Sequence, residues 1–303
     1  MKQKLIAICG PTSSGKSSLG IKLAKKIGAE IISVDSRQIY RGMDIVTGKE
    51  IGEWDGEREA MIVEGVVHFG LDIANPDEDF SAADFKGYAE KKSEEIAARG
   101  NVPMLVGGTG FWLQALIDNF DLTEANKDEE LRAKLETMSL EELAEAYKEL
   151  DPEGFETIDT KNKRRLIRAV EVCKLTGKPF SKQQTVSESN YDALQLCIDV
   201  PKDVLYERIN SRIDVMVGMG LLDEVQSLYE QYGCEVPSMT GIGYRQVCKY
   251  IDGLTTFEDA IEEMKKDSRH YAKRQVTWWK RDKRIVWVRS LEEAGGYINK
   301  FLK

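Results

Sequence analysis

The segment that most constrains this chain is "GPTSSGKS" at residues 10–17, which directly follows the apolar run "LIAIC" at residues 5–9. Its spacing of glycine, four residues, then glycine, lysine and serine is typical of a phosphate-binding loop between a strand and a helix. The backbone N–H groups of such a loop form a concave site for phosphate oxygens at the N-terminus of the helix. We therefore expect Lys16 to contact the terminal phosphate and Ser17 to hold Mg²⁺. The motif predicts a phosphate ligand, but it does not require a nucleotide.

Other apolar runs have the length and the glycine or polar boundaries of buried strands. They are "EIISV" at 30–34, "VVHFGLDI" at 66–73, "VPMLV" at 102–106, "ALQLCIDV" at 193–200 and "RIVWV" at 284–288. Stretches with helical periodicity lie between them, as in "SSLGIKLAKKIG" after the loop. Strands that alternate with helices indicate an α/β fold with a P-loop parallel-sheet core.

One long region departs from this alternation. Residues 121–190 are highly charged, have helical periodicity and contain no run typical of a strand. We interpret them as a helical insertion domain that interrupts the catalytic α/β core, which then comprises residues 1–120 and 191–303. The alternative is that they form surface helices of a single domain.

The composition, 42% apolar and 31% charged, is ordinary for a globular protein with a buried core. No run approaches the roughly 20 apolar residues that a membrane span needs, and the N-terminus lacks the pattern of a signal peptide. We therefore expect a cytoplasmic protein without a membrane partner. The five cysteines form no C-x-x-C pair and are expected to be reduced thiols, and the presence of only two histidines argues against a zinc site.

The net charge of −9 argues at first against a nucleic-acid partner, but the charge is unevenly distributed. Residues 121–159 contain fourteen acidic and four basic side chains, whereas residues 161–182 contain eight basic side chains and one acid. Residues 265–289 contain ten Lys or Arg and two Asp. Because local patches rather than the total charge decide the binding of a polyanion, a nucleic-acid partner remains open.

The segment "SVDSRQIYRGMDI" places Asp35 at the carboxyl end of the second expected strand. That edge of an open α/β sheet is where ligands bind. The next side chains, Ser36, Arg37 and Gln38, can hydrogen-bond to a base or to a nucleic-acid backbone. Two alternatives for Asp35 are a Mg²⁺ ligand acting through water and the N-cap of a helix.

Two glycine-rich segments also follow apolar runs or precede helical ones. "VGGTG" at 106–110 ends an expected strand and contains the hydroxyl of Thr109. "TGIGYRQV" at 240–247 is followed by helical periodicity and contains Arg245. Taken alone, the first fits an ordinary tight turn and the second fits the start of a helix.

Two basic segments have the composition of a nucleic-acid surface. "KNKRRLIR" places Arg164, Arg165 and Arg168 at helical spacings that share a face. "SRHYAKRQVTWWKRDKR" intersperses Lys and Arg with Tyr271, Trp278 and Trp279. Positive charge combined with aromatic side chains is typical of proteins that stack on unpaired nucleotides. The alternative is that each segment is a solvated helix face.

Together these segments resemble the tRNA dimethylallyltransferase family, also called the tRNA isopentenyltransferase family, in its bacterial form. The resemblance extends almost from end to end. Its segments, in order along the chain, are "GPTSSGKS", "DSRQIYRGMDI", "LDIANPDEDFSAADF", "VPMLVGGTGFW", "RRLIRAVEVCKLTGKP", "GLLDEVQSLY", "GIGYRQV" and "YAKRQVTWW".

The resemblance implies that dimethylallyl diphosphate donates its five-carbon group to the exocyclic N6 amine of an adenosine in tRNA, with release of diphosphate. That adenosine is 3′-adjacent to the anticodon, so the partner is the anticodon stem-loop. The P-loop would then hold the diphosphate of the donor. The reacting adenine would be flipped out of its stack to meet the donor. A monomer is the expectation for the family.

The resemblance also implies residue roles. Asp35 would act as the base at the adenine amine, Thr109 would line the reaction channel, and Lys16 would stabilise the leaving diphosphate. Diphosphate contacts are implied for Gly10, Pro11, Thr12, Ser13, Ser14, Gly15, Lys16, Ser17 and Arg212. Mg²⁺ would be held at Ser17. Contacts with tRNA are implied for Asp35, Ser36, Arg37, Gln38, Arg164, Arg165, Arg168, Thr240, Gly241, Ile242, Gly243, Tyr244, Arg245, Lys273, Arg274, Gln275, Thr277, Trp278 and Lys280.

Three departures from the family pattern are visible. "VTGKE" at 46–50 stands where the family commonly has Gly-Thr-Ala-Lys-Pro, the following stretch up to residue 67 is longer than usual, and Ser17 replaces a commoner threonine. Three other functions remain as alternatives: a P-loop kinase of small molecules, an RNA-binding protein without catalysis, and an adenylate isopentenyltransferase that acts on free nucleotides. The basic surface argues against the last of these.

Overall fold

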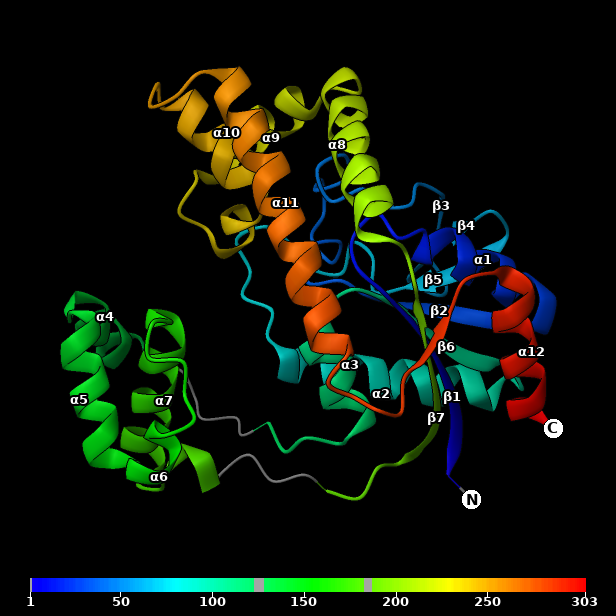
Figure 1. Ribbon diagram of the computed structural model, residues 1–303, viewed down its shortest axis with the longest axis horizontal. Coiled ribbons are helices and arrows are strands. Elements are labelled where there is room, and N and C mark those ends of the chain that lie inside the picture. The colour runs from blue at the N-terminus through cyan, green and yellow to red at the C-terminus, as the bar shows by residue number, and fades with distance from the viewer. Residues whose placement is uncertain (1, 123–127, 183–186) are drawn as a thin grey trace. The chain divides into compact units, whose positions relative to one another are not determined.

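The structure is a computed structural model that describes residues 2–122, 128–182 and 187–303 (Figure 1). The chain forms two compact units. One comprises Met1–Ile117 together with Asn190–Lys303, and the other comprises Asp118–Ser189. The second unit therefore interrupts the first in sequence, in the region where the charge pattern predicts a helical insertion.

An eight-stranded sheet forms the centre of the first unit, with the strand order β3-β4-β5-β2-β6-β1-β7-β8. The strands are β1 (Gln3–Cys9), β2 (Ala29–Val34), β3 (Glu53–Asp55), β4 (Ala60–Val63), β5 (Val66–Phe69), β6 (Val102–Gly107), β7 (Tyr191–Ile198) and β8 (Val286–Val288). From β5 across to β8, every pair of neighbouring strands runs parallel. The predicted α/β fold with a parallel core is confirmed, and each of the six predicted strands overlaps an observed one.

The other edge of the sheet contains two strands that the sequence did not predict. β3 and β4 pair antiparallel with each other, and β4 pairs antiparallel with β5, so the sheet is mixed rather than wholly parallel. These antiparallel strands lie in the stretch up to residue 67 that is expected from the sequence to be longer than usual. Glu64 and Gly65, which join β4 to β5, have φ of 49° and 79°. Two successive residues with positive φ are typical of a tight hairpin turn, and the glycine in "EG" is the sequence signal for it.

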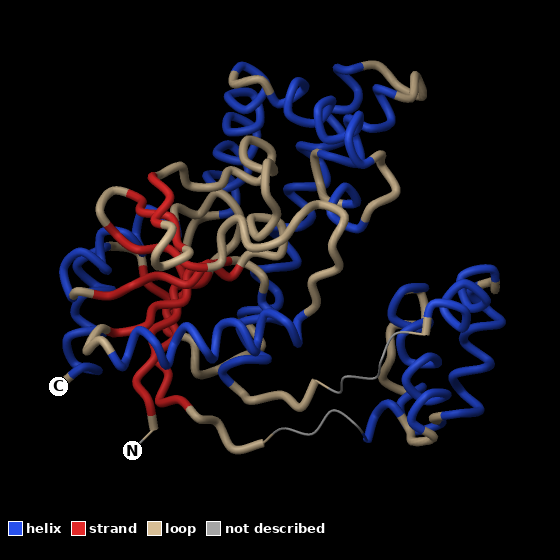
Figure 2. Tube along the Cα trace, turned by 180° about the vertical axis from the view of Figure 1, so that it is seen from behind, coloured by secondary structure: helices blue, strands red, loops and turns tan. Residues whose placement is uncertain are grey.

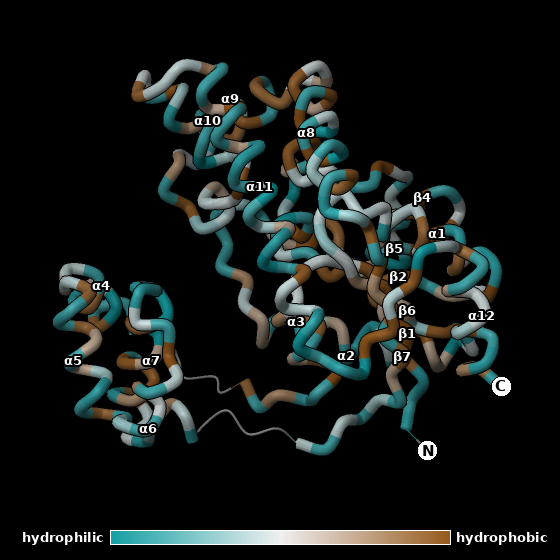
Figure 3. The backbone as a smooth tube through the Cα atoms, viewed as in Figure 1, coloured by the Kyte–Doolittle hydropathy of each residue, from teal (hydrophilic) through white to brown (hydrophobic). Residues whose placement is uncertain are grey.

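Helices cover both faces of the sheet. Successive strand residues point to opposite faces, so both faces carry apolar side chains that must be buried. In β1, Leu5 and Ala7 belong to one buried cluster and Ile6 and Ile8 to the other. The first cluster packs on α2 (Ala82–Ala98) and α3 (Gly110–Ile117), and the second packs on α1 (Lys16–Ile27) and α12 (Leu291–Leu302). Figure 2 shows the strands between these helices, and Figure 3 shows the apolar colour concentrated on the central strands.

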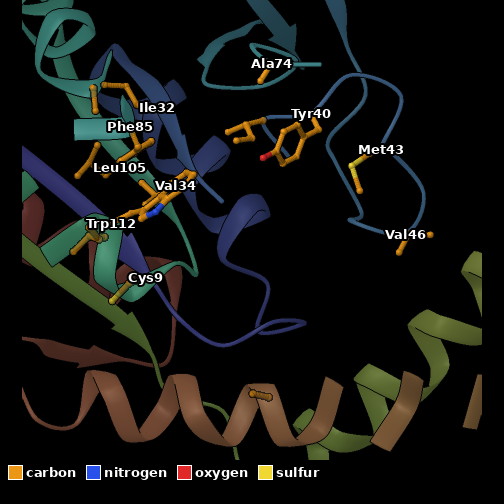
Figure 4. Packing of buried hydrophobic residues seen from close by; sticks show 14 of the residues in the cluster. Cys9, Ile32, Val34, Tyr40, Met43, Val46, Ala74, Phe85, Leu105 and Trp112 are labelled. Atoms are coloured by element: carbon orange, nitrogen blue, oxygen red, sulfur yellow. The ribbon is translucent and has the colours of Figure 1, made fainter. Parts of the chain in front are cut away.

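Four more helices extend this unit beyond the carboxyl end of the sheet. They are α8 (Lys202–Gly218), α9 (Leu221–Tyr232), α10 (Tyr244–Ile251) and α11 (Phe257–Trp279). Their buried side chains share one cluster with the loop after β2, in which Tyr40, Met43 and Val46 are buried (Figure 4). The helices and this loop therefore surround the sheet edge at which the P-loop and Asp35 lie.

The cysteines differ from the prediction. Cys234, just after α9, and Cys248, within α10, form a disulfide across a Cα–Cα distance of 6.2 Å, whereas all five cysteines were expected to be reduced. Cys9, Cys173 and Cys197 are free and buried. The pairing depends on the packing of α9 against α10, which brings together residues 14 apart in sequence.

The second unit contains α4 (Glu129–Thr137), α5 (Leu140–Leu150), α6 (Pro152–Phe155) and α7 (Lys163–Thr176). Each of these helices begins at an Asp, Ser or Asn whose side chain accepts a hydrogen bond from a backbone N–H of the first turn. The unit has its own core, in which Leu143, Tyr147, Leu166 and Val170 are buried.

Across the described part of the chain, the helices lack the combination of length and apolarity required to cross a bilayer.

Candidate active site

The P-loop joins β1 to α1 and leaves the first N–H groups of the helix available to a ligand. Gly15, the N-cap of α1, adopts a left-handed conformation with φ 88° and ψ 17°, and no side chain caps the helix. Glycine adopts this conformation without steric cost. Ser14 is buried, and its Oγ has no hydrogen-bond partner among the described residues. An uncapped helix start and an unsatisfied buried hydroxyl together form a site suited to an anion.

Lys16 is electrostatically prepared for an anion. Burial lowers the pKa of its ammonium from the ordinary value; the charge of Asp35 raises this pKa, and the guanidinium of Arg212 lowers it further. Arg212 comes from α8, more than 190 residues later in the sequence. Two cations that lie near each other in a partly desolvated site favour the binding of a multiply charged anion.

Asp35 and Thr109 form a connected pair at the carboxyl ends of β2 and β6. The Oδ1 of Asp35 accepts hydrogen bonds from the backbone N–H groups of Arg37 at 2.9 Å and Gln38 at 3.4 Å. The Oγ1 of Thr109 accepts one from the N–H of Ser36 at 3.1 Å. Asp35 therefore closes a turn and caps no helix, so the helix N-cap alternative is wrong. Its Oδ2 has no hydrogen-bond partner in the described part of the chain.

A cavity of about 290 Å³ lies beside these groups. Thr12 and Ser13 of the P-loop, Asp35 and Arg212 contribute to its polar wall. The apolar wall consists of Val46, Ile209, Ile213, Met216 and Met264. The cavity can therefore hold an anionic group at one side and a small hydrocarbon group at the other.

Tyr271 of α11 also lines this cavity. Burial, followed by the nearby charge of Asp35, raises the pKa of Tyr271 to about 12, so its phenol stays protonated at neutral pH. The guanidinium of Arg274 lies 5.7 Å from the centre of the Tyr271 ring. The sequence identified Tyr271 only as an aromatic residue within a basic segment, and its place beside Asp35 depends on the tertiary fold.

Gln275 has a different environment from the one expected for a tRNA contact. Its Oε1 accepts a hydrogen bond from the N–H of Thr12 at 2.9 Å, and its Nε2 donates to the carbonyl of Gly108 at 2.9 Å. The side chain is only 6% exposed. It connects the P-loop to the loop after β6. Because both ends of its amide are used within the protein, this side chain stabilises the two loops and is not placed to contact tRNA.

Arg37 and Gln38 line the approach to Asp35, and both side chains are engaged within the protein. Arg37 Nη1 donates to the carbonyls of Pro237 at 2.8 Å and Ser238 at 2.9 Å. Gln38 Nε2 donates to the carbonyls of Thr47 and Gly48 at 3.3 and 3.2 Å. These contacts fix the geometry of the cavity wall.

The segment 240–245 supplies another wall of the cavity, in which Thr240, Gly241, Ile242, Tyr244 and Arg245 take part. Tyr244 is 1% exposed, and burial, followed by the charge of Glu224, raises the pKa of its hydroxyl. Arg245 is exposed and forms an ion pair with Asp267. Gly243 lies at the N-cap of α10 with φ 97°.

The last turns of α11 present a basic surface. Lys273, Arg274, Thr277 and Lys280 are exposed, and Trp278 is half-buried. A second cavity is lined by His270, Lys273, Arg274, Thr277, Trp278 and Arg281. These residues lie on or directly after the helix that carries the cavity residue Tyr271, so this basic surface continues from the wall of the site.

The remaining predicted tRNA contacts lie in the second unit, on α7. Arg164 and Arg165 are exposed. Arg168 Nη1 donates to Oε2 of Glu171 at 2.8 Å, and Arg132 of α4 donates to the same oxygen at 3.1 Å. Because Glu171 is fully buried, Arg168 serves at least in part to neutralise it.

The surroundings of Ser17 fit a magnesium ion that is held mainly by a phosphate ligand. A small cavity of about 20 Å³ is lined by Lys16, Ser17, Asp35 and Glu50, among others. Hydroxyl and carboxylate oxygens are the ligands that Mg²⁺ prefers, and the ion commonly binds one or two of them together with substrate phosphates. Among the described residues, no group of three or more acidic, His or Cys side chains could hold a metal by itself.

Local motifs did not identify the residues that support this site from outside it. Three such residues contact the loop after β2. Glu224 accepts a hydrogen bond from a backbone N–H of this loop, and Lys49 donates to one of its carbonyls and to the carboxylate of Asp72. "GLLDEVQSLY" was part of the resemblance, but nothing in its pattern distinguishes Glu224 from a solvent-exposed helix glutamate.

The fold and the cavity define a P-loop α/β protein with a site suited to a phosphorylated ligand, next to a carboxylate at a strand end. A family model described as IPP transferase matches residues 38–282. The chain is 41% identical over 294 residues to the tRNA dimethylallyltransferase of Halalkalibacterium halodurans, covering 95% of this chain and 91% of that protein. It is 42% identical over 293 residues to that of Geobacillus thermodenitrificans, covering 95% and 90%.

Solved structures agree with these sequence comparisons. A tRNA isopentenylpyrophosphate transferase from Bacillus halodurans is 38% identical, with a TM-score of 0.73 over 99% of this chain and 97% of that chain. A eukaryotic dimethylallyltransferase acting on tRNA is 28% identical, with a TM-score of 0.80 over 99% and 79%. The chain belongs to the IPP transferase family.

Proposed function

We propose that this protein is a tRNA-modifying prenyltransferase, which moves the dimethylallyl group of dimethylallyl diphosphate to the N6 amine of the adenosine 3′-adjacent to the tRNA anticodon. One observation carries the mechanism: Asp35, Arg212 and the P-loop residues Thr12 and Ser13 line one cavity, and Lys16 of the same loop feels the charges of both Asp35 and Arg212. Two cations suit a leaving diphosphate, and a carboxylate suits an amine that loses a proton.

The donor binds with its diphosphate at the P-loop. The backbone N–H groups of Gly15, Lys16 and Ser17 at the start of α1, together with the side chains of Lys16 and Arg212, face its oxygens. The five-carbon group extends toward the apolar wall formed by Val46 and the side chains of α8 and α11. As the bond between C1 and oxygen breaks, its electron pair leaves with the diphosphate, and the cations stabilise the charge that develops there.

The acceptor adenine enters the cavity from the side of Asp35 and Thr109. Its N6 lone pair forms the new bond to C1, and the nitrogen then loses one proton. Asp35 Oδ2 accepts that proton, while Oδ1 stays bound to backbone N–H groups and keeps the carboxylate oriented. Thr109 holds the turn that carries Asp35. The flipped adenine fills the cavity and excludes water from the donor.

Magnesium would be held at this site by the hydroxyl of Ser17 together with oxygens of the bound diphosphate. When bound, the ion neutralises diphosphate charge and makes it a better leaving group.

The tRNA is held by exposed cations and by stacking surfaces. Within the first unit these are Arg245, Lys273, Arg274 and Lys280, with Trp278 as an aromatic platform. In the second unit, Arg164 and Arg165 supply additional phosphate contacts. This arrangement supports an anticodon stem-loop as the partner. A monomeric state and a cytoplasmic location remain predictions from the sequence.

Two alternatives make different predictions. A small-molecule kinase would explain the P-loop, but it leaves the exposed basic surface of α11 without a ligand. An enzyme that prenylates free adenine nucleotides would use the same cavity, yet it too has no need of that surface.

The experiment compares acceptors with radiolabelled dimethylallyl diphosphate as donor. Wild-type protein is incubated with unmodified tRNA, with an anticodon stem-loop, or with adenosine monophosphate. We expect label in tRNA and in the stem-loop. Label in the monophosphate alone would assign the nucleotide activity. Consumption of ATP without any prenyl transfer would assign the kinase class.

A further inference from the structure

A turn at residues 44–49, next to the cavity, holds two residues of the site in place. The carbonyl of Gly48 accepts a hydrogen bond from Arg212 Nη2 at 3.1 Å. The same carbonyl and that of Thr47 accept hydrogen bonds from Gln38 Nε2. Ser33 donates to Oε1 of Gln38 at 3.3 Å, so both ends of this amide are engaged. The direction of Arg212 therefore depends on where this turn places its carbonyls.

Glu224 of α9 anchors the first half of the turn. Its Oε2 accepts hydrogen bonds from the N–H groups of Asp44 at 3.0 Å and Ile45 at 2.5 Å, and its Oε1 accepts one from the N–H of Val46 at 3.1 Å. The hydroxyl of Tyr244 donates to Oε1 at 2.8 Å. Three consecutive backbone N–H groups around one carboxylate form a nest, a geometry that an uncharged amide side chain cannot satisfy because its NH₂ is a donor.

Lys49 anchors the second half. Its side chain is 3% exposed, and Nζ donates to the carbonyl of Tyr40 at 2.8 Å, to Asp44 Oδ1 at 2.6 Å and to Asp72 Oδ1 at 2.5 Å. All three protons of the ammonium are therefore used. A buried lysine without such partners would be costly, so these contacts make the position of residue 49 definite.

Gly48 itself leaves no room for a side chain. Its φ is 59°, and a Cβ there would lie 1.6 Å from Arg212 Nη2. An alanine at this position therefore has to displace the guanidinium. Gly42, in the same loop, has a similar φ of 73°, but the nearest atom to a Cβ there is a methyl of Leu228 at 3.8 Å. The two glycines share the same backbone constraint and differ in their proximity to Arg212.

We infer that Glu224 and Lys49 are positioning residues, which hold the 44–49 turn so that its carbonyls direct Arg212 toward the diphosphate of the donor. The inference rests on the proposed function for the identity of that ligand. It assigns to α9 and to the "VTGKE" segment at residues 46–50 a part in donor binding. Neither Glu224 nor Lys49 touches the substrate in this scheme; both act through Arg212.

The first test compares Gly48→Ala with Gly42→Ala in the full-length protein. Two quantities are measured: equilibrium binding of inorganic diphosphate and the KM for dimethylallyl diphosphate. Because the alanine displaces the hydrogen bond between Arg212 and the carbonyl of Gly48, we expect Gly48→Ala to weaken diphosphate binding and to raise the KM, each by about tenfold. Gly42→Ala, which carries the same backbone strain, should change both by less than about twofold. Equal effects of the two variants would overturn the inference.

The second test is a double-mutant cycle between Glu224→Gln and Arg212→Ala. If Glu224 acts through Arg212, Glu224→Gln weakens diphosphate binding about tenfold in the wild-type background and by less than about twofold once Arg212 is alanine. Asp223→Asn, which removes a carboxylate from the same turn of α9, serves as the control. Additive effects would show that Glu224 acts on the fold rather than on Arg212.

The two tests separate this inference from the proposed function. Binding of inorganic diphosphate requires no prenyl transfer, so it reports on Arg212 even if the acceptor is not tRNA. If Glu224→Gln does not fold in a thermal melt, the pair of glycine variants decides alone. Absence of transfer by wild-type protein would reject the proposed function while the cycle on diphosphate binding still tests the positioning.

Discussion

The cations near the P-loop and the arginines of α7 are both groups of basic side chains, but the structure organises them differently. Lys16 and Arg212 come from helices far apart in the chain; Arg212 lines the cavity beside the P-loop, and its charge acts on Lys16. Arg164, Arg165 and Arg168 come from one helix, and Arg168 pairs with the buried Glu171. The first group of cations lies beside a cavity that can hold a ligand, whereas the second includes an arginine that pairs with a buried carboxylate.

This difference shows what a basic cluster in a protein can mean. Cations drawn together from separate elements repel one another, so their proximity favours an anion that is bound from outside. Cations on one helix are held at their spacing by the helix backbone, so their proximity does not by itself indicate a bound anion. The expected contribution of each arginine of α7 to tRNA binding therefore has to be measured residue by residue.

The largest effect is expected at the centre of the cavity. Asp35→Asn retains an oxygen that can accept the N–H of Arg37, but it loses the charge that takes up a proton, so transfer should slow by about 10²- to 10⁴-fold. The measurement is single-turnover transfer to saturating tRNA at two Mg²⁺ concentrations. Recovery at high Mg²⁺ would instead assign Asp35 to the metal. A normal rate would remove it from the mechanism, and Asp77→Asn, at an exposed position, is the control.

Lys16→Ala tests the cation half of the same cavity. Loss of one preorganised donor to the leaving diphosphate should lower the transfer rate by about 10²- to 10³-fold. Affinity for tRNA should stay within about threefold of wild type, because the proposed contacts with tRNA are made by the exposed cations of α11 and α7. Filter binding and transfer are measured on the same preparations, with Lys22→Ala on the exposed side of α1 as the control. A protein that transfers normally but binds tRNA poorly would contradict the assignment.

Arg168→Ala examines the other side of the comparison. With Arg168 removed, Arg132 remains as the described cation that donates to buried Glu171, so the second unit should lose about 1–3 kcal/mol of stability. Faster hydrogen exchange of α7 amides would report this loss. Adding Glu171→Gln should restore much of the protection, because the uncompensated charge is then gone. Lys174→Ala, at an exposed position of the same helix, should leave the exchange unchanged.

The smallest effect is expected from the exposed arginines of α7. If Arg164 and Arg165 each bind one phosphate of tRNA, each alanine substitution should reduce the slope of log affinity against log salt by about 0.7 to 0.9. Binding of tRNA is measured between low and moderate salt, with Lys174→Ala again as the reference. A double variant with an unchanged slope would mean that these two arginines form a solvated helix face and that the cavity side alone binds tRNA.

Local sequence determined a large part of this protein. The spacing of "GPTSSGKS" predicts the P-loop from backbone geometry alone, and the apolar runs predict the six parallel strands, because both depend on neighbouring residues. The order of the motifs along the chain identified the family. The antiparallel strands at the sheet edge were also encoded locally, by a glycine at a tight turn, although they were not predicted.

What remained depended on contacts between residues distant in sequence. The pairing of Cys234 with Cys248, the burial of Gln275 between two loops and the nest around Glu224 all arise where α9, α10 and α11 pack against the carboxyl edge of the sheet. A glutamate on a helix surface and one that anchors three backbone N–H groups have the same local pattern. Only the tertiary structure distinguishes them, because the energy of such groups is set by the partners and the solvent exclusion that packing brings.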